Sequence, residues 1–355
     1  MLKSEIKKID YIDAIRGIAI IGVIVVHASQ CVSPTNKILL RIMEEGARGV
    51  QLFYIASALT LCMSWESRSS NEKYPIRNFY IRRIFRIVPM FYIAILSYML
   101  INGFAPGYWY PNGIKWWYIP LTATFLHGVH PETINSIVPG GWSIAVEMSF
   151  YAILPLLLPY IKSIKSCLIF FVIRLVLFAL NKFLIPYIFI YPEPYKYLII
   201  SFSYMNFFGQ LPIFIIGVFC YLIIQKNYPR KLIAIICGSL FVIFFIEFWY
   251  PQFKIPHHII AGALFSTFVI ILANWPKQIL VNKITTIFGK LSFSLYLTHF
   301  AILKYFALIG LNEIFFKSNL ASILYVLCVV FIAMPVSLFF YHYIEKNQAF
   351  GLVKI

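Results

Sequence analysis

Charged side chains are scarce in this chain. Asp, Glu, Lys and Arg make up 12% of its 355 residues, and 61% of the residues are hydrophobic. A soluble domain averages about 25% charged residues, so the composition excludes an ordinary soluble protein. It is typical of a polytopic membrane protein, and the length accommodates about ten spans of roughly 20 residues with their loops.

Acidic residues are the rarer charge. There are 13 Asp and Glu against 30 Lys and Arg, which gives a net charge of +17. Such a balance could indicate nucleic-acid binding. The basic residues concentrate, however, in loops on one side of the expected membrane, as the positive-inside rule predicts. We therefore expect membrane lipid as a partner and no nucleic acid.

Paired cysteines and the familiar metal and nucleotide motifs are missing. The six cysteines lie in or beside apolar runs without paired spacing, which indicates small core residues rather than disulfides or metal ligands. We find no HExxH, GxSxG, Walker loop or GxGxxG. No metal site is expected.

Hydropathy predicts an all-α polytopic integral membrane protein, with residues 1–355 forming a single membrane-embedded domain. Ten spans are expected near 12–33, 48–65, 84–104, 142–161, 167–187, 206–225, 232–250, 258–274, 287–310 and 321–344. With the N-terminus inside, the inner segments carry more than twice as many lysines and arginines as the outer ones, which predicts an N-in/C-in topology. The short aromatic segment 114–128 is expected to be an interfacial or re-entrant piece on the outer face.

Arg16 and His27 lie inside the first apolar run. An Arg in a span costs about 2.5–3.5 kcal/mol on insertion scales, so such residues usually have a function. Eleven helical positions at about 100° come to three turns plus roughly 20°, so both side chains project from one face, about 16 Å apart. This spacing predicts a fixed cation near one end of the span and a titratable base deeper in the bilayer.

Three arginines, Arg82, Arg83 and Arg86, mark the expected cytoplasmic entrance of the third span. Arg82 and Arg86 are four residues apart and share a helical face. Guanidinium groups bind phosphate through bidentate, permanently charged contacts, so the cluster suits a phosphorylated ligand from the cytosol. An ordinary positive-inside anchor is the alternative.

The segment GGWSIAVEMSFY (residues 140–151) opens the fourth span from the outer side. Glu147 lies about 7–8 Å below Trp142 along the helix, at a depth where an acidic residue needs a partner or a role. We expect Glu147 to meet His27 and to orient its imidazole. A structural contact between two helices is the alternative, and Ser143 is expected to be either the helix N-cap or a contact to an acceptor.

Three other polar residues fall within spans. His299, in LSFSLYLTHF, lies near the middle of the ninth span and is either a packing residue or part of the site. Arg174 and Lys182 in the fifth span could reach the interface or form pairs, and no specific role follows for them.

Several motifs together resemble the membrane-bound acyltransferase family 3, of the polysaccharide O-acetyltransferase type. YIDAIRGIAIIGVIVVHA (residues 11–28) carries that family's Arg and His separated by ten residues. RRIFRIVPMFY resembles its RRxxR motif, GGWSIAVEMSFY its WSLxxExxFY motif, and LSFSLYLTHF its SYSxYLxH motif. QLFYIASALTL resembles its second-helix segment, although Ala58 replaces the common Gly, and HYIEKNQ resembles its exit from the last helix.

The resemblance implies an acetyl-CoA-dependent O-acyltransferase of the bacterial inner (cytoplasmic) membrane. It would move an acyl group, most often acetyl, from cytosolic acyl-CoA to a hydroxyl of a carbohydrate such as a surface polysaccharide, a lipid-linked oligosaccharide or the O-antigen unit of lipopolysaccharide. Some members carry an extracytoplasmic SGNH domain, for which we expect no room in this chain. The acceptor would then be acylated directly or with the help of a partner.

The resemblance and the spacing together suggest roles for individual residues. His27 would be the general base, oriented by Glu147, with Arg16 on the acyl-CoA path. The CoA phosphates would bind Arg82, Arg83 and Arg86, and Arg16 would hold pantetheine or a phosphate oxygen. The acceptor would contact Trp142, Ser143, Tyr151 and His299.

Two other functions stay open at this stage. Intramembrane Arg, His and Glu also mark proton-coupled transporters, although no inverted repeat or pair of broken helices is evident. An acyl-relay subunit that hands acetyl to a separate transferase is the second, and His27 could itself carry the acyl group transiently. A homo-oligomer is also left open.

Overall fold

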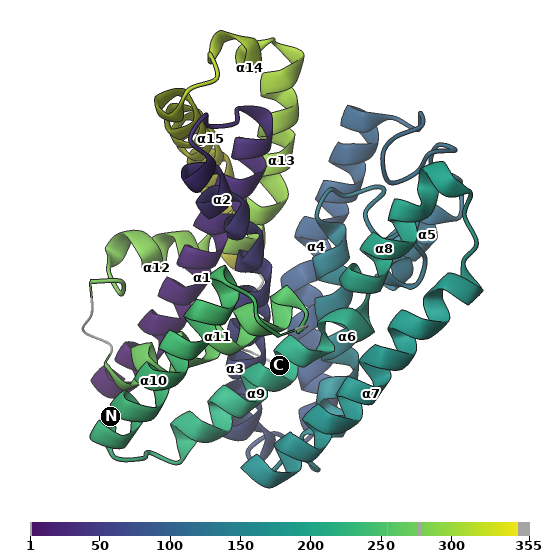
Figure 1. Ribbon diagram of the computed structural model, residues 1–355. Coiled ribbons are helices and arrows are strands. Elements are labelled where there is room, and N and C mark those ends of the chain that lie inside the picture. The colour runs from purple at the N-terminus through teal and green to yellow at the C-terminus, as the bar shows by residue number, and fades with distance from the viewer. Residues whose placement is uncertain (1, 254, 276–278, 347–355) are drawn as a thin grey trace. The chain divides into compact units, whose positions relative to one another are not determined.

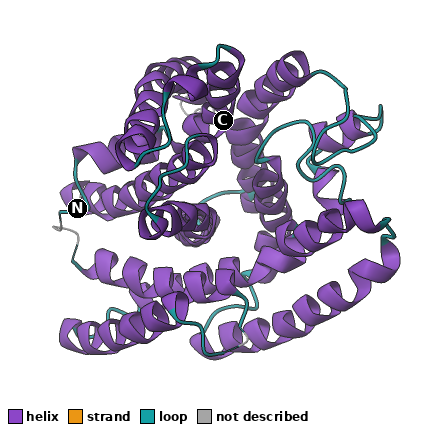
Figure 2. Cartoon of the chain, turned by 45° about the horizontal axis from the view of Figure 1, so that its top comes forward, coloured by secondary structure: helices purple, strands orange, loops and turns teal. Residues whose placement is uncertain are grey.

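The computed structural model describes residues 2–253, 255–275 and 279–346, with the side chains of 2–9 left out. Within these ranges every regular element is a helix, apart from an isolated bridge between Gly107 and Tyr110. Figure 2 shows helices joined by loops throughout this part of the chain. The all-α prediction is confirmed.

Each of the ten predicted apolar spans overlaps a helix. These are α1 (Leu2–Cys31), α3 (Gly49–Ser69), α4 (Pro75–Asn102), α6 (Gly141–Leu157), α7 (Ile164–Ile188), α9 (Phe207–Gln225), α10 (Arg230–Trp249), α11 (His257–Asn274), α13 (Ser292–Leu308) and α15 (Asn319–Phe340). Short elements connect them: α2 (Lys37–Glu44), η1 (Glu45–Arg48), α5 (Tyr118–Ala123), η2 (Leu126–Val129), η3 (Glu193–Tyr195), α8 (Lys196–Met205), α12 (Lys283–Lys290), α14 (Leu311–Ile314) and η4 (Tyr341–Glu345).

Seven helices in the described part of the chain are long and apolar enough to cross a membrane, or eight if one bent pair counts as a span. The chain is therefore a polytopic membrane protein by the length and composition of its helices. At the fourth predicted span, α6 has 17 residues and falls below that length. The count of ten and the N-in/C-in orientation stay predictions.

Two local expectations change with the structure. The span predicted at 287–310 is not one helix, because α12 and α13 meet at an angle of 77° around Leu291. The helix of the third span begins at Pro75 rather than near residue 84, so the three arginines lie within α4, and their place at the cytoplasmic entrance stays a prediction. Between residues 114 and 128 the chain forms α5 and η2, which are both too short to cross a bilayer. The HYIEKNQ motif ends at positions 347–348, outside the described residues.

The helices divide into two compact units. Of the described residues, unit 1 holds 2–60 and 223–346, and unit 2 holds 61–222. In unit 1, α1 packs along α12 and also contacts η1, α13 and α15 (Figure 1). In unit 2, α4 contacts α5 and α6, α6 contacts η2 and α8, and α7 contacts α8.

Glycines let the helices of unit 1 approach closely. A Cβ on Gly289 of α12 would collide with the backbone of Asp13 in α1, and one on Gly17 would collide with the backbone of Thr285. Gly22 of α1 and Gly46 of η1 form a similar pair. Membrane helices commonly use small residues in this way, because lipid offers no hydrophobic driving force for their association. The α1 helix that carries Arg16 and His27 is thereby held at backbone contact.

Candidate functional site

His27 lies on α1, four residues before its last residue, and is partly exposed. Its Nδ1 is 3.2 Å from Oε1 of Gln30, one helical turn further on. An amide oxygen only accepts hydrogen bonds, so Nδ1 carries the proton and Nε2 carries the lone pair. Nε2 makes no hydrogen bond within the described residues. In this neutral tautomer Nε2 can accept a proton, as a general base must.

A second histidine lies beside the first. His299 of α13 is fully buried, and its ring centroid is 5.5 Å from that of His27. Nδ1 of His299 donates to the carbonyl of Leu295 at 2.9 Å, so its Nε2 is also unprotonated, and Nε2 has no hydrogen-bond partner in the described part of the chain. Phe300 packs against both rings, with centroids 4.4 Å from His27 and 4.1 Å from His299.

Arg16 shares the unbroken helix α1 with His27, so the expected spacing along one face holds. Its Nη2 donates to Oγ1 of Thr60 at 3.2 Å, and that hydroxyl donates to the carbonyl of Ala56 at 2.5 Å. Arg16 is therefore tied to α3. Its role toward a donor stays a prediction.

The three arginines of α4 have different surroundings. Arg82 pairs with Glu72, with Nη1 2.6 Å from Oε1. Arg83 is buried, and its guanidinium carbon lies 5.7 Å from each of the ring centroids of Phe79 and Tyr151. Arg86 is exposed. The phosphate clamp stays a prediction, with Arg86 as its most accessible member.

Glu147 has a partner on its own helix. The hydroxyl of Tyr151, one turn further along α6, donates to Oε1 of Glu147 at 2.5 Å. Because Arg83 lies against the ring of Tyr151, this carboxylate belongs to a polar group that joins α6 to α4 within unit 2. His27 belongs to unit 1, so the expected pairing of His27 with Glu147 stays a prediction.

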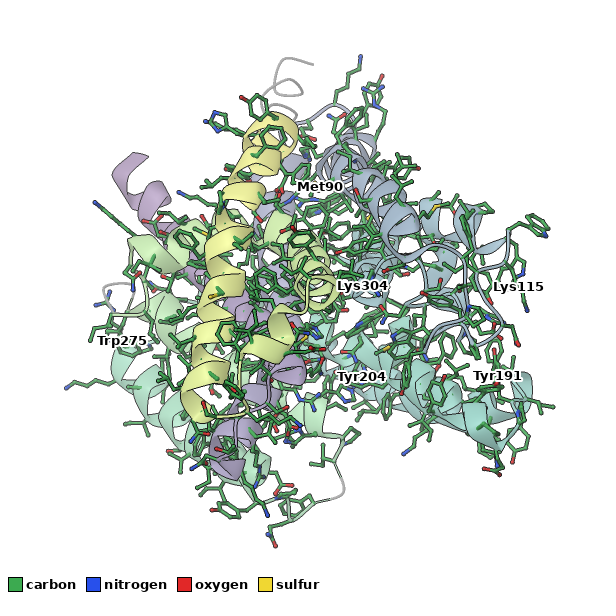
Figure 3. The ribbon with its side chains drawn as sticks, turned by 90° about the horizontal axis from the view of Figure 1, so that it is seen from above. Met90, Lys115, Tyr191, Tyr204, Trp275 and Lys304 are labelled. Atoms are coloured by element: carbon green, nitrogen blue, oxygen red, sulfur yellow. The ribbon has the colours of Figure 1, made fainter. Side chains whose placement is uncertain are left out.

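Trp142 and Ser143 occupy the first turn of α6. Trp142 is buried, and its ring centroid is 5.8 Å from that of Tyr204 on α8, which Figure 3 labels. The N-cap of α6 is Gly140, whose φ of 75° suits glycine. Ser143 lies inside the helix and donates to the carbonyl of Gly140 at 3.0 Å. The expectation that Ser143 is the N-cap is therefore wrong.

The loop before α6 contains a polar cluster that the sequence motifs did not indicate. Glu132 is buried and accepts hydrogen bonds from the hydroxyls of Tyr118 and Tyr191, the latter at 3.0 Å (Tyr191 is labelled in Figure 3). Burial and the carboxylate of Glu132 raise the pKa of both tyrosines. Nearby, Nε2 of the buried His127 donates to the carbonyl of Gly141 at 3.0 Å, and burial lowers the pKa of His127 to about 4. These contacts stabilise the loop.

The apolar helices with polar side chains inside them define a multi-pass membrane protein. A family model described as an acyltransferase domain matches residues 9–342, so the chain belongs to the acyltransferase 3 family, as the sequence motifs indicated. No solved structure matches the chain.

Curated relatives from bacteria share this family region. "Putative O-acetyltransferase SACOL0978" of Staphylococcus aureus (strain COL) is 24% identical over 345 residues, which covers 85% of this chain and 52% of the relative. "Peptidoglycan O-acetyltransferase OatA" of Listeria monocytogenes is 25% identical over 181 residues, 45% of this chain and 26% of the relative. Where a curated relative matches most of this chain, the chain spans about half the length of that relative.

Proposed function

We propose that this protein transfers an acetyl group from acetyl-CoA to a hydroxyl of a carbohydrate in the bacterial cytoplasmic membrane. Membership of an acyltransferase family supports the reaction class, and the names of the bacterial relatives favour acetyl and an oxygen acceptor. The Listeria relative, named for peptidoglycan, favours a carbohydrate of the cell surface. The observation that carries the proposal is the hydrogen bond from His27 to Gln30, which leaves Nε2 as a proton acceptor.

In the proposed reaction, Nε2 of His27 takes the proton of the acceptor hydroxyl as the oxygen attacks the thioester carbonyl. The new C–O bond forms, the C–S bond breaks, and the CoA thiolate leaves and recovers the proton from the imidazolium. A positioned base of this kind contributes about 10²–10⁴-fold in rate. Gln30 keeps Nδ1 protonated throughout and fixes the plane of the ring.

The donor phosphates are assigned to Arg82, Arg83 and Arg86, and the accessible Arg86 is expected to make the strongest contact. Arg82 would have to exchange Glu72 for a phosphate, and Arg83 would act mainly through its charge because it is packed between two rings. We keep Arg16 on the path of the donor. Trp142, Ser143, Tyr151 and His299 remain the proposed acceptor contacts.

The test separates chemistry from donor binding. Membrane vesicles that contain the full chain receive acetyl-CoA and lysozyme-digested peptidoglycan, and thiol release is measured together with ester-linked acetate on the glycan. His27→Ala should lower kcat by about 10²–10⁴-fold with little change in KM. Arg86→Ala should raise the KM for acetyl-CoA by about tenfold or more, the loss expected for a charge-assisted phosphate contact.

The matched control is His342→Ala, because His342 is an exposed histidine of the same unit. It should keep the wild-type kcat. An active His27→Ala enzyme would remove the base assignment. Absence of thiol release with every glycan offered, with transport of a proton or solute instead, would favour the transporter. A trapped acetyl-imidazole on His27 would replace direct attack by a covalent intermediate.

A further inference from the structure

Arg174 of α7 is the most unusual charged residue of unit 2. Most of α7 is exposed, yet Arg174 is 1% exposed and is among the largest fully buried side chains. All three guanidinium nitrogens lack a hydrogen-bond partner in the described part of the chain, and no carboxylate there pairs with them. Its neighbours are aromatic: the guanidinium carbon is 5.3 Å from the ring centroid of Phe171 and 5.6 Å from that of Phe178.

Such an arrangement is costly without a ligand. A guanidinium has five N–H donors and cannot lose its charge in a protein. An aromatic ring face attracts the cation, but it does not replace the hydrogen-bond acceptors that the N–H groups need. Buried charges are ordinarily paired or hydrogen-bonded, because removal of such a group from water without a partner is strongly unfavourable. Because Arg174 is buried, its head group is shielded from solvent by the protein itself.

The helix register shows what Arg174 faces. Sγ of Cys167 lies 3.7 Å from the carbonyl of Ile215, and Nδ2 of Asn181 lies 3.5 Å from the carbonyl of Ser203. Cys167, Arg174 and Asn181 are each seven residues apart and therefore lie within about 40° on one face of α7. The opposing chain runs antiparallel from Ser203 to Ile215, so Arg174 lies opposite the residues midway between them, near position 209.

At that position the helical hydrogen-bond ladder is interrupted. The α8 helix ends at Met205 and α9 begins at Phe207, with Asn206 between them in an extended conformation. Oδ1 of Asn206 accepts a hydrogen bond from the backbone N–H of Gly209 at 3.0 Å and so caps the first turn of α9. Asn206 and Gln210 are buried polar residues. Irregular backbone at membrane depth is tolerated where it is buried in protein or lines a cavity.

We propose that Arg174 and the α8–α9 junction form an anion-binding site in unit 2, which takes a phosphate or carboxylate group. The fixed positive charge and its unsatisfied donors favour an oxyanion, and the two phenylalanine rings lie against the guanidinium. The anion is supplied either by a soluble substrate or by the headgroup of a lipid. The site is separate from the assigned roles of His27 and Arg86 and is tested without turnover.

The experiment measures hydrogen exchange of the segment 203–212 in the full chain reconstituted into phosphatidylcholine nanodiscs. One arm adds inorganic pyrophosphate or acetate, and the other replaces part of the lipid with phosphatidylglycerol. All chains carry Arg86→Ala, so that anions at the proposed donor clamp do not contribute. An anion is expected to protect this segment in the chain with native Arg174 and in the control Lys182→Met, which removes an exposed cation of the same helix.

Protection should disappear in Arg174→Met, and in Arg174→Lys it should require about tenfold more anion, because lysine lacks the bidentate geometry. The lysine variant decides the question if the methionine variant does not fold. Protection by soluble anions in phosphatidylcholine assigns the site to a substrate, and protection by phosphatidylglycerol alone assigns it to a lipid. Equal protection in Arg174→Met, or no protection by any of these anions, would overturn the proposal.

Discussion

His27 in unit 1 and His127 in unit 2 differ in what their second ring nitrogen can do. His127 is 1% exposed, stacks on Phe91 and donates to a backbone carbonyl. His27 is partly exposed and uses a side chain of its own helix to hold its Nδ1 proton. For His127, burial and a backbone partner indicate a structural role, whereas a general base needs a fixed tautomer together with an accessible lone pair. The comparison shows why the two residues, alike in the sequence, have different expected roles.

The surroundings of the two histidines are also built differently. Around His127, buried polar groups such as Glu132 and Tyr118 bond to one another within a loop. The position of the His27 ring depends on α1. Backbone contacts at glycines hold this helix against α12. We therefore expect added side-chain volume at the α1–α12 contact to disturb the His27 region. We expect protonation of His127 to destabilise its own region.

The largest effect should come from Gly289→Val. Its side chain would collide with the backbone of Asp13, which cannot move aside as a flexible side chain can. Overpacking of a tight contact costs about 1–3 kcal/mol, and a clash with backbone belongs at the upper end of that range. The purified variant should lose several degrees of thermal midpoint and most of its acetyl transfer.

The control for this variant is Gly238→Val in α10 of the same unit, because no atom lies within 4 Å of a Cβ added there. Its thermal midpoint should stay near that of the wild type. Equal thermal midpoints for Gly289→Val and Gly238→Val would show that the α1–α12 contact does not support the site.

The second effect is a loss of stability on acidification through His127. The pKa of His127 is lowered from 6.5 to about 4 by burial, so the unfolded chain binds this proton more tightly than the folded chain does. The stabilisation is complete above pH 6.5 and is lost as the pH falls toward 4. The expected loss between pH 8 and pH 5 is about 2 kcal/mol.

Thermal midpoints of the wild type and of His127→Gln at pH 8 and pH 5 measure this contribution. The wild type should lose more stability than the variant. The pKa of His130 is lowered too, mainly by burial, so His127→Gln should keep part of the pH dependence. An identical pH dependence in both proteins would contradict the burial of a neutral His127.

The sequence predicted the parts of the fold that depend on local pattern. Apolar length located the helices, and the eleven-residue spacing placed Arg16 and His27 on one face, because α1 is regular over its whole length. The bend between α12 and α13 was not predictable, since it accompanies the close approach of Gly289 to Asp13, a contact distant in sequence.

The same limit applies to the site. Arg83 looks like its neighbour Arg82 in the sequence, and its burial depends on the ring of Tyr151 from another helix. Gln30 was missed although its signal is local: an amide three residues after a candidate base lies on the same helical face. His299 was expected as an acceptor contact, and its position beside the ring of His27 depends on the packing of α13 against α1.

The smallest effect on the rate should come from a change at Gln30. This change tests most directly whether a fixed tautomer distinguishes His27 from His127. Gln30→Leu keeps the size of the side chain and removes the oxygen that holds Nδ1–H of His27. A neutral hydrogen bond contributes about 1 kcal/mol, so kcat should fall about fivefold to tenfold while the KM for acetyl-CoA stays constant. Gln30→Glu keeps an acceptor at the same distance and should restore most of the rate. If Gln30→Leu turned over at the wild-type rate, the tautomer of His27 would have to be fixed by the acceptor or by another residue, and an accessible lone pair alone would distinguish His27 from His127.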